Sequence, residues 1–244
     1  MPASHFGQPI LRVLGLAVSV IASATPQPTL VVRWSADQPG CAFQAADDGS
    51  YRYALATDDF SVTLAMDAQE LDKARRRVEP ILGLFLSVRF LKQNPSPLAL
   101  RKITLEFVMH FHTAETPLDP EDLAARLLVD DKKETQAVAQ EIRKHPEEKD
   151  ALEATLKAQQ QNTSQTMEWA RAKTLPSTPA ENNEVSGWLL FAARSRWIGE
   201  LNRQEEFLLR VPLGNVVVEF PFTLPPSQGD VRLRTRNADQ SAHR

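Results

Sequence analysis

The sequence predicts a mainly β protein with an α insertion: a single antiparallel β-sandwich that carries a helical hairpin. Short segments in which apolar and polar residues alternate indicate strands with one buried face. Between residues 119 and 174 the apolar spacing changes to about 3.6 residues, which indicates helix. Strands and helices do not alternate along the chain, and there is no glycine-rich phosphate-binding fingerprint. An antiparallel sandwich is therefore the simplest architecture.

The first 24 residues have the pattern of a secretory signal peptide. Arg12 is the only charged residue before the small and apolar run VLGLAVSVIASA, and the run ends in Ala22-Ser23-Ala24. This ending predicts cleavage before Thr25. The run is about a dozen residues long, which is shorter than the ~20 that span a bilayer. We therefore expect an exported protein, periplasmic or extracellular, with no stable membrane insertion after processing.

The charge of the chain limits the kinds of partner that it can bind, and its cysteine content limits how the fold can be cross-linked. The formal net charge of −3 provides no basic footprint for nucleic acid. Cys41 is the only cysteine, so no disulfide can form within the chain. In an oxidising compartment we expect Cys41 to be buried as a small apolar residue, or else to pair between molecules.

Strands are predicted through the first half of the mature chain. Alternating patterns cover residues 29–34, 51–56, 59–66, 81–90 and 103–112, and a further strand is expected beside Cys41. The segment 81–90 begins with apolar residues on both of its faces, so something should cover it. In the last strand Leu105, Phe107, Met109 and Phe111 form the predicted core side, and His110 and His112 occupy the opposite side.

His110 and His112 are the candidate metal ligands of this sequence. Two histidines on one face of a strand have a spacing that suits Zn²⁺ or Cu²⁺. A third ligand would have to be Glu115, His145 or an acidic residue of the helical insertion, and no HExxH pattern or cysteine set supplies it. We therefore expect a strand face that is exposed or covered by helix, without a metal or other cofactor, and metal binding is the alternative.

The helical insertion at 119–174 has clear start and break signals. Asp119 can cap the first helix and Pro120 suits its first turn. Pro146 predicts a break at Lys144-His145, and a second helix should run to about Lys173. The apolar stripe on both helices is narrow. This predicts an antiparallel pair that packs on itself and leans on the strands at its base.

Strands return after the insertion. They are predicted over 185–193, 203–213 and 215–222, with a hairpin turn at Gly214-Asn215. One domain should therefore span residues 25–226, and the polar tail 227–244 is expected to be disordered.

The late segment WLLFAARSRWIGELNRQEEFLLRVPL…VVVEFPFTLPPSQGD resembles exported bacterial proteins of uncharacterised families with immunoglobulin-like sandwiches. The resemblance covers residues 188–230. It implies an immunoglobulin-like fold and export, and it carries over no catalytic residue.

No catalytic pattern is present, because there is no G-x-S-x-G elbow and the paired carboxylates are adjacent in sequence, so on a strand they point to opposite faces. The sequence predicts an exported, non-catalytic interaction domain that binds an unknown protein or surface. Besides metal binding at His110 and His112, a carbohydrate-binding module is an alternative. It would use aromatic residues among Trp34, Trp169, Trp188 and Trp197, of which Trp197 is expected to be the most exposed.

Overall fold

The structure is a computed structural model, and it describes residues 30–46, 50–67, 81–92, 97–180, 182–193 and 204–225. The predicted signal peptide at 1–24, the predicted tail at 227–244 and Trp197 lie outside the described residues.

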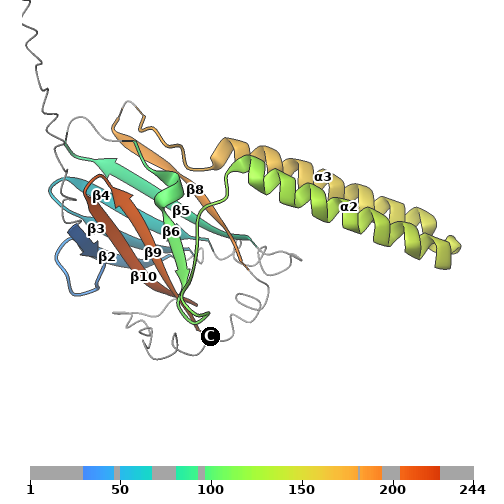
Figure 1. Cartoon of the computed structure of the whole chain (residues 1–244), viewed down its shortest axis with the longest axis horizontal. Helices are drawn as coiled ribbons and strands as arrows, with labels where there is room; N and C mark the ends of the chain where they lie inside the picture. The colour runs from blue at the N-terminus through green and yellow to red at the C-terminus, as the bar shows by residue number, and fades with distance from the viewer. Residues whose placement is uncertain are drawn as a thin grey trace, which may run out of the picture.

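Two five-stranded sheets pack face to face, with a pair of long helices to one side (Figure 1). The first sheet has the order β1 (Leu30–Arg33), β10 (Val216–Leu224), β9 (Glu205–Leu213), β6 (Thr104–Phe107) and β7 (Thr113–Glu115). The second sheet has the order β2 (Cys41–Ala45), β3 (Tyr51–Ala56), β4 (Phe60–Met66), β5 (Ile81–Phe90) and β8 (Glu184–Ala192). A 3-10 helix, η1 (Leu100–Lys102), precedes β6. The predicted β-sandwich with a helical insertion is confirmed.

One strand pair differs from a purely antiparallel arrangement. β1 runs parallel to β10, while the other neighbouring strands of both sheets are antiparallel. Parallel neighbours need a long connection between them. Here nearly the whole described chain lies between β1 and β10, so the first and last strands can meet at this edge.

The core lies between the sheets and is built by the alternating apolar residues. Trp34 is 1% exposed, and its indole N–H donates to the carbonyl of Ala54 at 3.0 Å. The ring of Trp34 meets that of Tyr53 edge-to-face with centroids 5.0 Å apart, and Phe207 stacks on Phe222 at 5.1 Å. Cys41 is half-buried and packs against this core rather than inside it.

The helical insertion forms an antiparallel hairpin that we call the arm: α2 (Pro120–Lys144), a 3-10 turn η2 (Pro146–Glu148) and α3 (Lys149–Lys173). The Asp119 carboxylate accepts hydrogen bonds from the backbone N–H groups of Glu121 and Asp122, at 3.0 and 2.8 Å. This confirms the predicted cap. Each helix has 25 residues, so the arm is about 37 Å long and extends away from the sandwich (Figure 1).

The base of the arm supplies the cover that β5 requires. Leu123 of α2 and Ala170 of α3 are buried together with Ile81 of β5 and Leu190 of β8. Further out, the two helices contact each other through a polar step, at which the Thr163 hydroxyl donates to Asp131 at 2.9 Å. The expectation that the helices pack on each other and lean on the strands at their base is confirmed.

The predicted strand 103–112 is wrong in its second half. β6 ends at Phe107, and residues 108–112 form a turn that leads into β7. Phe111 and His112 have left-handed backbone conformations, with φ of 59° and 54°, which cannot continue a strand. Phe111 was expected on the core side, but it is 86% exposed.

Among the residues that the structure describes, no helix is both long and apolar enough to cross a membrane.

Candidate functional site

The turn 108–112 separates the two candidate histidines. His110 Nε2 lies 3.0 Å from Glu205 Oε2 at the start of β9. His112 Nδ1 contacts Glu106 Oε1 on β6. The two imidazoles therefore engage different carboxylates, and the expected placement on one strand face is wrong.

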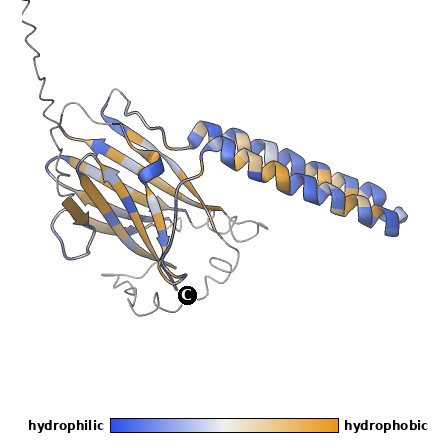
Figure 2. Ribbon diagram, viewed as in Figure 1, coloured by the Kyte–Doolittle hydropathy of each residue, from blue (hydrophilic) through white to orange (hydrophobic). Residues whose placement is uncertain are grey.

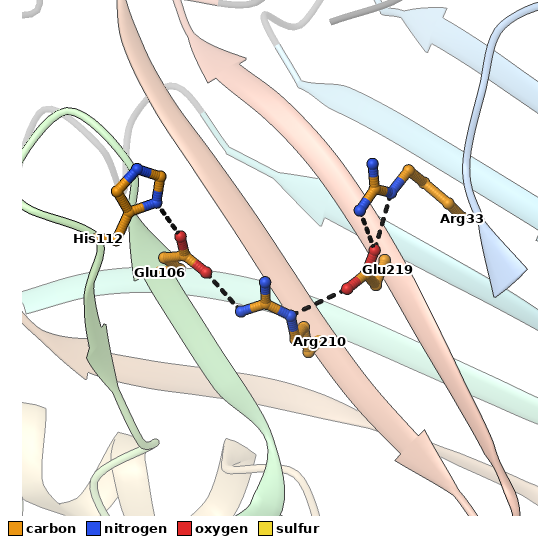
Figure 3. A network of polar contacts seen from close by, with 5 residues as sticks. All are labelled: Arg33, Glu106, His112, Arg210 and Glu219. Carbon is orange, nitrogen blue, oxygen red and sulfur yellow. Dashed lines mark hydrogen bonds and ion pairs between the residues drawn. The ribbon is translucent and has the colours of Figure 1, made fainter. Parts of the chain in front are cut away.

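His112 is the end of a chain of ion pairs that crosses the first sheet, and we call this chain the charge ladder (Figure 3). It runs through His112, Glu106, Arg210, Glu219 and Arg33. Arg210 donates to Glu106 Oε2 at 2.5 Å and to Glu219 Oε1 at 2.9 Å. Arg33 donates twice to Glu219 Oε2, at 2.8 and 2.6 Å.

The strand register brings the charge ladder together. Arg33, Glu219 and Arg210 are direct partners across β1, β10 and β9. The direct partner of Arg210 on β6 is Thr104, and Glu106 lies two residues further along the same face. Long side chains on adjacent strands can reach such diagonal neighbours. These residues share the face opposite the core, since the residues between them point inward.

Burial and pairing act in opposite directions on the charged groups of the ladder. The side chains of Glu219 and Glu106 are only 8% and 11% exposed. Burial by itself raises the pKa of Glu106, but hydrogen bonds from His112 and Arg210 together with their charges hold it below its ordinary value. Burial likewise lowers the pKa of Arg210, and the two glutamates raise it above its ordinary value. Glu106 and Arg210 are therefore both charged at neutral pH.

The ladder fixes strands and the turn in place. Both oxygens of Glu106 and both oxygens of Glu219 are engaged by cationic or imidazole partners. The carboxylates hold the turn to the sheet at one end and β1 to β10 at the other. In the part of the chain that the structure describes, no group of three or more His, Cys, Asp or Glu side chains gathers as a metal site would require.

The described tryptophans do not form a common platform. Trp34 is in the core between the sheets. Trp169 of α3 and Trp188 of β8 lie with ring centroids 5.6 Å apart, and Trp188 also meets Phe85 at 5.7 Å. Trp169 and Trp188 pack at the base of the arm, so their position has a structural reason.

Apart from His112, the ladder residues were missed from the sequence, although a signal was present. Glu106, Arg210 and Glu219 each stand as a lone charge within an apolar strand segment: TLEF, FLLRV and VVVEF. Three such lone charges of both signs, on strands that can neighbour one another, are typical of cross-strand ion pairs. The register that joins them was not available from the sequence.

The chain matches no known family model, no curated protein and no solved structure.

Proposed function

We propose that the protein is an exported, non-catalytic binding domain and that the arm contacts a partner protein. The observation that carries this proposal is that two 25-residue helices stand outside the sandwich and take no part in its main core.

The arm is attached to the sandwich but does not complete it. The main core between the sheets contains no residue of α2 or α3. The contact is confined to the base, where Leu123 and Ala170 meet Ile81 and Leu190. A helix pair that only covered the sheet would need a few turns, whereas the arm continues for about 37 Å. Its length therefore requires a reason other than the stability of the sandwich.

The surface of the arm fits a protein partner better than nucleic acid or lipid. Figure 2 shows polar residues along most of its length, with isolated apolar positions. Leu128 and Val129 are 56% and 54% exposed, and they are separated by about 100° around the helix. Acidic and basic side chains alternate, as in the exposed pair of Lys133 with Asp130 at 3.2 Å. A non-obligate protein interface is, taken as a whole, about as apolar as the rest of a protein surface and has a polar rim, so this mixed surface is compatible with a protein partner.

Export is supported by the N-terminal pattern, in which Arg12 precedes an apolar run that ends in Ala22-Ser23-Ala24. The partner should therefore be sought in the periplasm or outside the cell.

The test compares the full chain with a variant in which residues 120–173 are replaced by a short Gly-rich linker. Both are produced in the native host, and the exported fraction is separated by size under native conditions. We expect the full chain to elute in a complex larger than its own mass and the armless variant to elute as a free chain. A full chain that elutes alone, or an armless variant that still enters the complex, would refute the proposal.

A further inference from the structure

The outer face of the first sheet, which carries the charge ladder, is buried at one end although no described helix or strand covers it. On this face Leu208 of β9 and Pro221 of β10 are direct neighbours, and both are buried. Leu208 belongs neither to the core between the sheets nor to the cluster at the base of the arm. Figure 1 looks onto this face, and no labelled helix or strand lies in front of β9 and β10.

The burial of this face increases toward the end at which β10 finishes. Thr223, next to the last residue of β10, is 4% exposed. At the opposite end of the same face Val217 is only half-buried, and its partner Val31 on β1 is 53% exposed. A buried apolar side chain such as Leu208 on the face that points away from the core requires neighbours above it. The end at Thr223 therefore has a cover that the described helices and strands do not supply.

The C-terminal segment of the chain, residues 226–244, is attached at this end. β10 ends at Leu224, and the described chain continues only to Pro225. At about 3.3 Å per residue, the residues that follow reach ~60 Å when extended, whereas the outer face measures about 20 Å from Thr223 to Val217. The segment is therefore long enough to return across the whole buried end.

The sequence of the segment favours such a return. Pro226 cannot donate a hydrogen bond to a continuing strand, and Gly229-Asp230 is typical of a turn. The residues after this turn read VRLRTR, in which Val231 and Leu233 alternate with arginines. In an extended chain this alternation separates the two kinds of side chain. The apolar side can therefore pack on the sheet while the guanidinium groups stay in water.

We propose that residues 226–244 form a strap across the outer face of the first sheet, in which Val231 and Leu233 pack on Leu208 and Pro221. By composition alone the tail is expected to be disordered, because it has too few apolar residues for a core of its own. The sheet supplies the apolar partner that the tail lacks. Glu106 of the charge ladder is the direct neighbour of Leu208, so the strap also keeps water from the ladder, and this strengthens its ion pairs.

The experiment uses the full exported chain, purified and dilute, with photoreactive benzoylphenylalanine in place of Leu233. A matched control carries the same group in place of Arg234, the next residue, on the opposite side of the strap. We expect irradiation at position 233 to give an adduct within the chain, which mass spectrometry maps to residues 205–213 or 216–224. Position 234 should give several times less of this adduct, because its side chain faces water.

A second measurement compares Leu233→Ser with Arg234→Ser by urea unfolding. Leu233→Ser should lower the midpoint, because it removes a packed apolar side chain, and Arg234→Ser should leave the midpoint unchanged. The inference would be overturned by no adduct from position 233, by an adduct with the arm or with a second copy, by equal yields from both positions, or by equal midpoints. Both measurements use the chain without a partner, so their result is independent of whether the arm binds one.

Discussion

At the residue scale, the charge ladder shows how a few polar side chains constrain an apolar sheet. Arg210 stands between two carboxylates that are nearly buried, and it shares the pairing of Glu219 with Arg33 and the pairing of Glu106 with His112. The partners are distant in sequence, since 104 residues separate Glu106 from Arg210 and 186 separate Arg33 from Glu219. The ladder therefore connects three parts of the chain that no local pattern relates.

Replacing Arg210 should strongly destabilise the protein. Arg210→Gln leaves the nearly buried carboxylates of Glu106 and Glu219 without the cation that lies between them, so we expect the free energy of unfolding to fall by about 3 kcal/mol. The matched control is Arg101→Gln. The Arg101 side chain is 94% exposed and lies 3.9 Å from Asp119, so its loss should change stability by less than about 1 kcal/mol. Urea unfolding of both variants measures this, and equal effects would show that the ladder is not a buried network.

The ladder should also make stability depend on acid pH. The pKa of Glu106 in the folded state lies below its ordinary value of 4.5, so its contribution is fully present above that value and is lost as the pH falls through the folded-state pKa. The gap in unfolding free energy between wild type and Glu106→Gln should therefore be widest near neutral pH and close as the pH drops below about 4.5. Urea titrations across this range measure the gap. A gap that stays constant would contradict the assignment.

The cost of the left-handed backbone at Phe111 can be measured by substitution. Phe111→Gly and Phe111→Ala both remove an exposed ring, but only glycine accepts the left-handed backbone without a clash. We expect the glycine variant to be more stable than the alanine variant by about 1 kcal/mol. The same two substitutions at Leu128, inside α2, should give the opposite order, because glycine destabilises helices. An alanine variant at position 111 that is as stable as the glycine variant would show that the left-handed backbone costs little at this position.

At the element scale, the sequence predicts the helices and strands correctly where residues that are close together in the chain determine their ends or their alternation. The cap at Asp119, the break after Lys144 and the alternation in β4 and β9 are local signals, and the structure confirms each of them. The end of β6 at Phe107 was not predictable in this way, because apolar residues continue the alternation to Phe111. The turn is fixed by Glu205, which is 95 residues away from His110. Its conformation therefore depends on tertiary contacts.

The stability of the arm should be limited by the polar contact between Asp131 and Thr163, which lies in the middle of the interface between α2 and α3. Thr163→Val alone leaves Asp131 without the hydroxyl donor and should destabilise the arm by about 1 kcal/mol. Asp131→Leu combined with Thr163→Val places two apolar side chains in contact, and we expect the arm to gain about 1–2 kcal/mol. Helix content followed by far-UV circular dichroism during heating measures both. A double variant less stable than Thr163→Val would show that two apolar side chains do not stabilise the interface between α2 and α3.

At the scale of the whole molecule, the sandwich should fold without the arm. Closing the gap between Asp119 and Thr174 with a flexible linker adds little chain entropy, but Ile81, Leu190 and Trp188 lose their cover. We therefore expect the armless variant to unfold cooperatively, in one transition, with a lower midpoint than the full chain. Thermal unfolding followed by tryptophan fluorescence tests this, because Trp34 reports on the core. A gradual transition would mean that the arm completes the core.

The central claim, that the arm is the contact element of a binding domain, is tested most directly by hydrogen–deuterium exchange of the full chain, free and in its native complex. Amides between residues 128 and 166 lie beyond the packed base, so in the free protein we expect them to exchange faster than those of β4, β5 and β9. In the complex the same arm amides should become protected, while those of the sandwich core change little. Protection confined to the sandwich, with the arm exchanging as fast as in the free chain, would contradict the account.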